Sequence, residues 1–215
     1  MNQRRKSPIY RHHPNINLDY FKVIDTKEKA YWLGFLFADG WLSRQTKNVR
    51  FGVSSDIKDE LQIDRFANAI GFNLKYKYYP QHETERNLVK LRFMNRQFAY
   101  NLVKHGYIIG KQKSKHIQLP KLSSRALYLA FLLGYFDGDG KVYSARITCG
   151  SKKFLLQIKE LFNLDNVIAK KYSGPTPIHG HKLHGMCYEM GFGKALFQEM
   201  LANYHDSLPR KRILK

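Results

Sequence analysis

An internal repeat constrains the fold of this chain more than any other feature of its sequence. Residues 30–40 read AYWLGFLFADG and residues 130–140 read AFLLGYFDGDG, so that five of the eleven positions are identical at an offset of 100 residues. Most of the other positions are apolar in both copies. Because a duplicated unit sets the number of domains, we expect two similar halves related by a pseudo-twofold axis, residues 23–118 and 119–215.

The pattern that follows each copy predicts the same order of elements in both halves. Alternating polar and apolar residues are typical of half-buried strands, and apolar residues at helical spacing indicate helices. In the first half these segments are strand 48–54, helix 56–70, strands 74–79 and 87–93, and helix 97–105. In the second half they are strands near 141–149, helix 152–162, strands 167–172 and 183–190, and helix 193–204. Each half reads as αββαββα, which predicts an α+β fold with two four-stranded antiparallel sheets and a linker near 115–123.

The charge of the chain indicates the class of its partner. The 215 residues include 37 Lys+Arg and 17 Asp+Glu, a net charge of +20, while 43% are hydrophobic and 14% aromatic. That content of core-forming residues excludes a disordered basic tail. A folded chain with this much positive charge fits a polyanion, with nucleic acid ahead of an anionic membrane surface. Cys149 and Cys187 are too few for a disulfide framework or a zinc ribbon.

Residues 1–22 are expected to form a basic N-terminal arm. Arg4, Arg5, Lys6 and Arg11 occur here without an apolar run behind them, so a signal peptide is not expected. A short organelle-targeting segment and a plain solvated tail are the alternatives. No stretch of the sequence reaches the ~18 consecutive apolar residues of a membrane span, so no membrane partner is expected.

The repeated segments are too apolar to be surface helices, so we expect both to be buried. Small residues recur along one face of each segment, since residues four apart lie on the same side of a helix. They are Ala30, Gly34 and Ala38 in the first segment and Ala130, Gly134 and Gly138 in the second. Small side chains let two backbones approach closely, so we expect these helices to pack against each other.

This packing would place Asp39 and Asp139 side by side, because Gly40 and Gly140 would end both helices at the same level. Two carboxylates at helix C-termini repel each other and the helix dipoles, so the arrangement needs a cation. Hard oxygen ligands indicate Mg²⁺, and Mg²⁺ that holds phosphate oxygens is typical of phosphodiester hydrolysis.

At these residues the chain resembles the LAGLIDADG homing endonucleases, specifically the single-chain members with two copies of a nine-residue motif. Residues 32–40 read as one copy and residues 132–140 as the other. The resemblance implies a monomeric, Mg²⁺-dependent enzyme that cuts both strands of a long double-stranded DNA target, in intron homing or as a free-standing endonuclease. An RNA maturase or a DNA-binding regulator that kept the scaffold and lost cleavage is the alternative.

The resemblance also implies roles for particular residues. The implied ligands of the divalent ions are Asp39 and Asp139, helped by the backbone carbonyl groups of Ala38 and Gly138. The chain departs from the family pattern at Phe37, where an earlier motif acid is expected, whereas Asp137 keeps that acid. Because the earlier acid is not the main ligand, the change concerns packing of the motif more than activity.

A basic residue that follows the last helix of each half reaches the catalytic centre in that family. Lys113 and Lys211 occupy matching places here, with plain phosphate contact as the alternative role. Ser55 stands where many relatives carry a polar residue that organises water, at the end of the second strand. Ser151 or Lys152 would take this role in the second half.

In the fold that the resemblance implies, the helices cover one face of each sheet and leave the other as a saddle for duplex DNA. Strand alternation then selects the side chains that face DNA. They are Ser43, Gln45, Arg50, Lys75, Lys77, Lys90, Arg92, Lys141, Tyr143, Ala145, Arg146 and Thr148. An ordinary solvated sheet face is the alternative. We expect at least one of Gln45, Arg50 and Arg146 to read a base, since Arg pairs with guanine and Gln with adenine.

Overall fold

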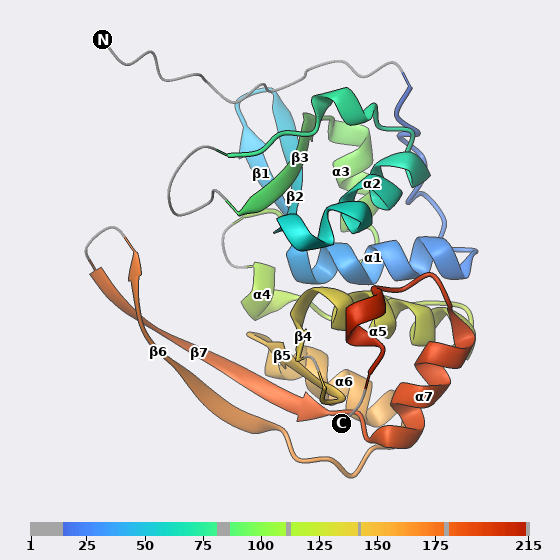
Figure 1. Cartoon of the computed structure of the whole chain (residues 1–215), viewed down its shortest axis with the longest axis vertical. Coiled ribbons are helices and arrows are strands. Elements are labelled where there is room, and N and C mark those ends of the chain that lie inside the picture. The colour runs from blue at the N-terminus through green and yellow to red at the C-terminus, as the bar shows by residue number, and fades with distance from the viewer. Residues whose placement is uncertain (1–14, 81–86, 111–112, 142, 179–180, 214–215) are drawn as a thin grey trace.

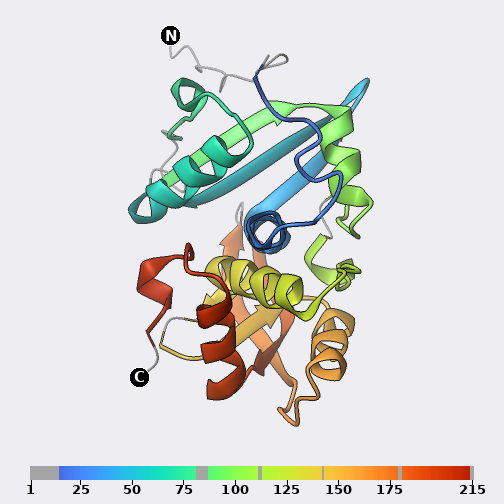
Figure 2. The same cartoon turned by 90° about the vertical axis from the view of Figure 1, so that its right-hand side faces the viewer.

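The computed structural model describes residues 15–80, 87–110, 113–141, 143–178 and 181–213 of the chain. Two long helices, α1 (Lys27–Asp39) and α5 (Arg125–Asp139), lie side by side at the centre, with one half of the molecule on each side of this pair (Figure 1). Figure 2 shows α1 almost end-on between the two halves. The α+β architecture with two similar halves, predicted from the repeat, is confirmed.

The two central helices are in direct backbone contact through one glycine on each. A Cβ atom added to Gly34 would lie 1.9 Å from the carbonyl oxygen of Phe131, and one added to Gly134 would lie 1.9 Å from that of Tyr31. The equal distances reflect the pseudo-twofold relation of the two helices. The close packing expected from the spacing of small residues is therefore confirmed.

Both central helices begin and end in the same way. The hydroxyl groups of Thr26 and Ser124 accept backbone hydrogen bonds and cap the two N-termini. At the other end, an extended glycine leads each helix directly into a strand, β1 (Gly40–Gln45) or β4 (Gly140–Lys141). The two motif acids are therefore the last helical residues of α1 and α5.

The first half consists of an antiparallel sheet with helices packed on it. Strands β1, β2 (Asn48–Asp56) and β3 (Leu88–Met94) pair in that order. The 3-10 turn η1 (Ile57–Asp59) leads into α2 (Glu60–Ala69), and α3 (Arg96–Val103) follows β3. Buried phenylalanines, among them Phe51 and Phe93, lie on the strand face that packs against these helices. We call the opposite face, which carries the half-buried side chains of Arg50 and Ser54, the open face of the sheet.

The first sheet has three strands within the described residues, not the four that the sequence predicts. The expected strand at 74–79 begins instead with the 3-10 turn η2 (Leu74–Tyr76), because the side chain of Asn73 accepts a hydrogen bond from Lys75 N at 3.1 Å. Tyr78 alone of this segment pairs with the sheet, through an isolated bridge to Lys90. A local side-chain cap thus prevails over the alternation of polar and apolar residues.

The second sheet has the predicted four strands, in the order β4-β5-β7-β6. Its remaining strands are β5 (Arg146–Cys149), β6 (Ala169–Ile178) and β7 (His181–Gly191), and its helices are α6 (Lys152–Leu161) and α7 (Lys194–Asn203). Strands β6 and β7 form a long hairpin that extends well beyond the rest of the sheet (Figure 1). A short helical segment follows the last long helix of each half, α4 (Lys113–His116) in the first and η4 (Pro209–Lys211) in the second.

Residues 15–22, predicted to belong to a basic arm, pack on the first half. Ile16, Tyr20 and Phe21 are buried, and the backbone nitrogen of Asn17 donates to the carbonyl oxygen of Ile70 at 2.8 Å. Arg4, Arg5, Lys6 and Arg11 of the expected arm lie in residues 1–14, outside the described residues. In the described part of the chain, no helix has both the length and the apolar character needed to cross a membrane.

Candidate active site

Asp39 and Asp139 lie close together where the two central helices end. A Cβ atom added to Gly138 would lie 3.2 Å from Oδ2 of Asp39, so the carboxylate of one helix reaches the backbone of the other. Burial and the nearby charge of Asp139 raise the pKa of Asp39 to about 7. The side chain of Asp139 is open to solvent on one side, yet the surrounding protein removes enough water to raise its pKa as well. The pKa values of both carboxyl groups are thus raised where the two helices end.

A lysine caps the C-terminus of α1. Nζ of Lys113, the first residue of α4, donates hydrogen bonds to the carbonyl oxygens of Leu36 (3.2 Å), Ala38 (2.7 Å) and Gly40 (2.7 Å). A positive charge is favourable at a helix C-terminus, where unpaired carbonyl groups carry partial negative charge. Burial lowers the pKa of Lys113 to about 8.

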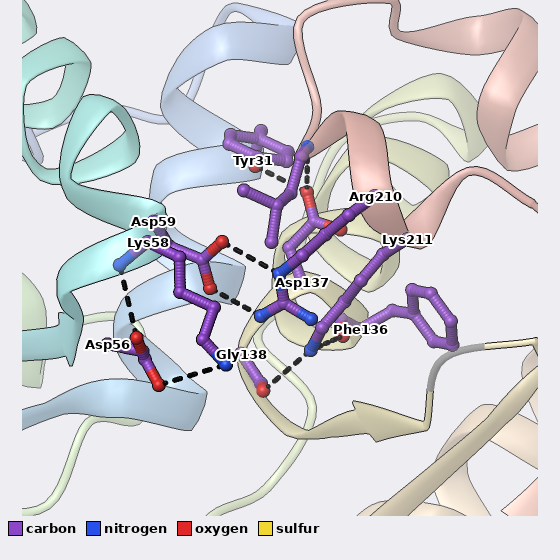
Figure 3. A network of polar contacts seen from close by, with 10 residues as sticks. Tyr31, Asp56, Lys58, Asp59, Phe136, Asp137, Gly138, Arg210 and Lys211 are labelled. Carbon is purple, nitrogen blue, oxygen red and sulfur yellow. Dashed lines mark hydrogen bonds and ion pairs between the residues drawn. The ribbon is translucent and has the colours of Figure 1, made fainter.

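A second lysine caps α5 in the equivalent way. Nζ of Lys211, in η4, donates to the carbonyl oxygens of Phe136 (3.1 Å) and Gly138 (2.9 Å), which stand 100 residues after Leu36 and Ala38 (Figure 3). Burial lowers the pKa of Lys211 below the ordinary value for lysine. The pseudo-twofold relation of the halves therefore extends from the acids to the lysines.

The carbonyl groups expected to assist a metal ion already accept hydrogen bonds in this structure. Ala38 accepts from Lys113 and Gly138 from Lys211. A carbonyl oxygen has two lone pairs, so each group keeps one for a cation.

The donor set at the helix ends fits Mg²⁺. Among the described residues, Lys113 and Lys211 act on the Asp39 carboxylate through their charge, and no group of three or more His, Cys, Asp or Glu side chains is placed to hold a metal ion. Mg²⁺ prefers carboxylate oxygens together with several waters or phosphate oxygens over an all-protein cage. Two carboxylates with room for outside ligands match that preference.

A groove of about 720 Å³ has Asp139 in its wall. It runs between α4 and the second sheet. Its walls include Ser114, Lys115, Thr148 and Lys152.

Asp137 and Phe37 occupy equivalent positions on the central helices but make different contacts. Asp137 is buried, and its Oδ2 atom accepts hydrogen bonds from the hydroxyl of Tyr31 and the backbone nitrogen of Leu208, both at 2.6 Å (Figure 3). Burial raises the pKa of Asp137 to about 6. The ring of Phe37 instead packs edge-on against Tyr107, with the centroids 5.2 Å apart. An aromatic contact thus stands where the family pattern has an acid.

Three predicted DNA-facing residues of the first half form one hydrogen-bonded cluster on the open side of the sheet. Ser43 and Arg50 are cross-strand partners. Gln45 Nε2 donates to Ser43 Oγ (3.2 Å), and Arg50 Nη2 donates to Gln45 Oε1 (3.3 Å). All three side chains are half-buried, so the cluster is held in place.

Arg92 lies on the same open face, between two aromatic rings. Its guanidinium carbon is 4.7 Å from the ring centroid of Tyr78 and 5.6 Å from that of Trp41. The ring of Trp41 in turn lies over Gly52, where an added Cβ atom would be 2.2 Å from the indole. Stacking restricts the motion of a guanidinium group.

The three lysines predicted to face DNA in this half differ from the expectation of exposed side chains on strands. Lys75 lies in η2 rather than in a strand. Lys77 is turned toward α2, where its Nζ atom binds Asp64 Oδ1 (2.5 Å) and the carboxylate of Glu60. Lys90 is on the open face by register but only 7% exposed. Acidic residues on α2 therefore explain the placement of Lys77 and the turn at Asn73 explains that of Lys75, while DNA contact by these three lysines stays a prediction.

The predicted DNA-facing residues of the second half lie along β4, β5 and their turn. Lys141, Tyr143 and Arg146 are exposed, whereas Ala145 and Thr148 are half-buried. Arg146 Nη1 donates to Glu189 Oε1 at 3.0 Å, and Lys171 Nζ donates to Glu189 Oε2 at 2.6 Å. A buried carboxylate thus sits at the centre of this basic face.

The candidate residues for organising water are not equivalent. Ser55 is half-buried near the end of β2. Ser151 is the N-cap of α6, and its hydroxyl accepts a hydrogen bond from Phe154 N at 3.2 Å. Lys152 lines the groove beside Asp139, so it is the better placed of the two second-half candidates.

Sequence reasoning missed several residues of this region. Glu189 lies in the expected strand 183–190, where period-two alternation would have placed it on the same face as its neighbours across the sheet. Trp41 directly follows the first motif and lies two residues before Ser43, so strand alternation places both side chains on the same face of the sheet. The ion pair of Asp59 with Arg210 joins residues 151 positions apart, and no local pattern signals it.

Comparison with known proteins identifies one family model and several similar folds. Residues 126–202 match the model of the LAGLIDADG-like domain family. The fold is similar to that of the homing endonuclease I-WcaI bound to its DNA recognition sequence, over 95% of this chain and 96% of that chain, with 12% identity and a TM-score of 0.53. A variant of I-DmoI in complex with nicked target DNA and manganese is similar over 88% and 98% of the two chains, with 14% identity and a TM-score of 0.49. No curated protein sequence matches the chain.

Proposed function

We propose that this chain, which has the fold of the LAGLIDADG homing endonucleases, is a site-specific endonuclease that hydrolyses both strands of duplex DNA with Mg²⁺ held between Asp39 and Asp139. The observation that supports this most is the paired arrangement at the ends of α1 and α5, where each half contributes one carboxylate and one lysine. The two antiparallel backbones of DNA are themselves related by twofold axes. One acid and one lysine are therefore available for each strand.

The two acids and their surroundings suit a divalent cation. Asp39 and Asp139 would hold it, next to the carbonyl oxygens of Ala38 and Gly138, and Mg²⁺ bound there would neutralise phosphate charge and lower the pKa of a water nucleophile. The raised pKa of Asp39 reflects its burial and its repulsion from Asp139. A bound cation relieves that repulsion, so the repulsion between the two acids favours the metal-bound state.

The lysines supply positive charge that is already in place. Nζ of Lys113 and Nζ of Lys211 are fixed by carbonyl oxygens of the helix ends rather than free in solvent. Preorganised charge next to a reacting phosphate stabilises the negative charge that develops in the transition state. Each lysine would act on the strand nearest to its own half.

The open faces of the two sheets would bind the duplex, one half-site each. The cluster of Ser43, Gln45 and Arg50 offers hydrogen-bond donors and acceptors close to the motif helices, as Arg146 does in the second half. The net charge of +20 supplies attraction to the phosphates. Because residues 23–118 and 119–215 supply both halves of the site in one chain, we infer that the enzyme acts as a monomer.

A randomised duplex library incubated with the protein and Mg²⁺, followed by sequencing of the new ends, tests this proposal. We expect discrete double-strand breaks at one family of sequences. Asp39→Asn and Asp139→Asn should lose cleavage but still bind those sequences. Full double-strand cleavage by either variant would contradict the assignment of the acids.

The same experiment separates cleavage from the alternative roles. A maturase or a regulator on this scaffold would bind RNA or DNA but would produce no new DNA ends in the presence of any divalent metal ion. Survival of both acids and both capping lysines favours the nuclease, since a non-cleaving protein has no need to keep two repelling carboxylates. Whether the enzyme serves intron homing or acts as a free-standing nuclease follows from where its sites lie.

A further inference from the structure

An ion pair ties the residue before Lys211 to the other half of the molecule. Arg210 Nε donates to Asp59 Oδ1 at 2.7 Å, and Arg210 Nη2 donates to Asp59 Oδ2, so the contact is two-pronged (Figure 3). Asp59 is only 6% exposed and lies at the start of α2, in the first half. Fork-shaped pairs of this kind fix geometry as well as charge. The turn that carries one lysine of the site is thus anchored across the molecule.

Asp137 holds the other end of the same turn. Its Oδ2 atom accepts from the backbone nitrogen of Leu208, and the backbone nitrogen of Lys211 donates to the carbonyl oxygen of Leu208 at 3.0 Å. Tyr31 donates to the same carboxylate oxygen and accepts from Gln62 on α2. A chain of hydrogen bonds therefore runs from α2 through α1 and α5 to the start of η4.

The first half anchors its lysine by different means. Phe37 replaces the acid, and its partner Tyr107 donates a hydrogen bond to the carbonyl oxygen of Leu36 at 2.9 Å. Leu36 also accepts from Lys113, so the phenol and the ammonium share one helix end. In the described residues of this half, the anchor is an aromatic pair and a phenol rather than a carboxylate.

We propose that Asp137 and the Asp59–Arg210 pair are positioning residues for Lys211, so that scission of one DNA strand depends on a polar clamp that the other strand does not need. This rests on the proposed nuclease function. The ammonium of Lys211 reaches Phe136 and Gly138 only while η4 stays in place. A displacement of about 1 Å in a catalytic group can cost on the order of 100-fold in rate, and the loss would fall on the strand served by Lys211.

Strand-resolved cleavage of the target duplex tests the clamp. Asp59→Asn and Asp137→Asn keep the side-chain shape, and we expect each to slow one strand by about 10-fold or more while the other stays within about 3-fold. Nicked DNA should therefore accumulate. Its nick should lie in the same strand that Lys211→Ala still cuts. Tyr107→Phe is the matched variant of the first half and should slow the opposite strand. Equal slowing of both strands by Asp59→Asn and Asp137→Asn would overturn the proposal.

A double variant separates positioning from general destabilisation. If Asp59 acts through Lys211, Asp59→Asn combined with Lys211→Ala should be no slower than Lys211→Ala alone. Additive losses would mean that Asp59 acts by another route. Arg210→Lys should show a milder form of the same strand bias, since lysine keeps the charge without the fork.

Hydrogen exchange of the DNA-free protein provides a readout that does not require cleavage. Asp59→Asn and Asp137→Asn should speed exchange at the backbone amides of Leu208 and Lys211, with exchange in β5 and β7 unchanged. Unchanged exchange in this turn would overturn the clamp even if the enzyme cuts DNA. If these variants speed exchange in the turn but the parent protein cuts no duplex, the proposed nuclease function is rejected. The role of Asp59 and Asp137 in positioning the turn would still hold.

Discussion

Asp39 stands where a negative charge is unfavourable, at the C-terminus of a helix, beside Asp139 and largely surrounded by protein. Folding raises its pKa from the ordinary 3.8 to about 7, so the folded state favours the protonated form. The stability contributed by protonation is fully present below about pH 4 and is lost as the pH rises through 7. At neutral pH the site therefore carries a cost in stability, as binding sites commonly do.

We expect Asp39→Asn to stabilise the metal-free protein at pH 8 by up to about 2 kcal/mol, because the variant has no carboxyl to ionise. The gain should shrink as the pH falls toward 4. Urea unfolding in EDTA at pH 5 and pH 8 measures the difference. Asp165→Asn, at an exposed position, is the control for the same chemical change. A variant that is less stable than the parent at pH 8 would contradict this account.

Glu189 is the acidic residue at the centre of the basic face of the second half. The hydrogen bond from Lys171 lowers its pKa, so the carboxylate stays ionised and holds Arg146 and Lys171 on either side of it. A base reader needs a fixed direction, whereas a phosphate contact needs only charge. On the proposed DNA-binding face, Glu189 would weaken the attraction for DNA while it fixes the direction of Arg146.

We expect Glu189→Gln to bind scrambled duplex more tightly, because a negative charge leaves the DNA face, and to discriminate less at one base position. The lost discrimination should amount to roughly 1–3 kcal/mol if Arg146 reads a base there. Fluorescence anisotropy with single-base target variants at fixed salt measures both effects. Glu199→Gln is the control, since it removes the same charge from α7, where Glu199 pairs with Arg125. It should alter neither the affinity for scrambled duplex nor the base discrimination. Unchanged discrimination would place Arg146 among the phosphate contacts.

At the scale of elements, α1 and α5 decide the geometry of the site. The closeness of their backbones, 1.9 Å from an added Cβ to a carbonyl oxygen on both sides, leaves no space for a side chain at Gly34 or Gly134. Any residue larger than glycine would push the helices apart and separate the two acids at their ends. Stability and the alignment of the site therefore depend on the same contact.

Gly134→Ala is expected to destabilise the protein by about 3 kcal/mol or more, since the new methyl group would meet backbone rather than a movable side chain. Gly191→Ala is the control. An added Cβ there would find its nearest neighbour at 3.6 Å, so the change should be close to neutral. Urea unfolding of both variants checks the prediction, and equal stability of Gly134→Ala and the parent would refute the packed-glycine contact.

At the scale of the whole molecule, the two halves share a centre but differ at their ends. Within the described residues, the first sheet has three strands, whereas the second carries a hairpin of 10 and 11 residues in β6 and β7. At about 3.3 Å per residue, such strands extend for roughly 33 Å. The proposed enzyme would thus combine a pseudo-symmetric active site with an asymmetric DNA-binding surface.

We expect the footprint on the target to extend further from the cut on the side of the second half. Replacing residues 174–184 by a two-residue Asn-Gly turn, which suits the antiparallel partners Ser173 and Gly185, should shorten it on that side alone. Hydroxyl-radical footprinting of the parent and the shortened variant shows the difference. A symmetric footprint of the parent would mean that the hairpin does not lie along DNA.

Much of this protein follows from its sequence alone. The repeat predicts two halves, the spacing of small residues predicts contact between two helices, and the motif acids end those helices together because both segments have the same length and end in glycine. The alternation in 48–54 and 87–93 correctly separates the core face of the first sheet from the open one. These features depend on short-range periodicity, which the covalent chain imposes wherever the segment folds.

Other features were decided only by the tertiary structure. Lys77 turns toward Asp64 because α2 happens to pack beside the segment that carries it, and the expected strand there yields to the turn at Asn73. The carbonyl groups of the helix ends are occupied because the chain after α3 and α7 returns to them with a lysine. The pair of Asp59 and Arg210 joins elements 151 residues apart. Contacts of this kind depend on which elements become neighbours in space, and no periodicity along the chain carries that information.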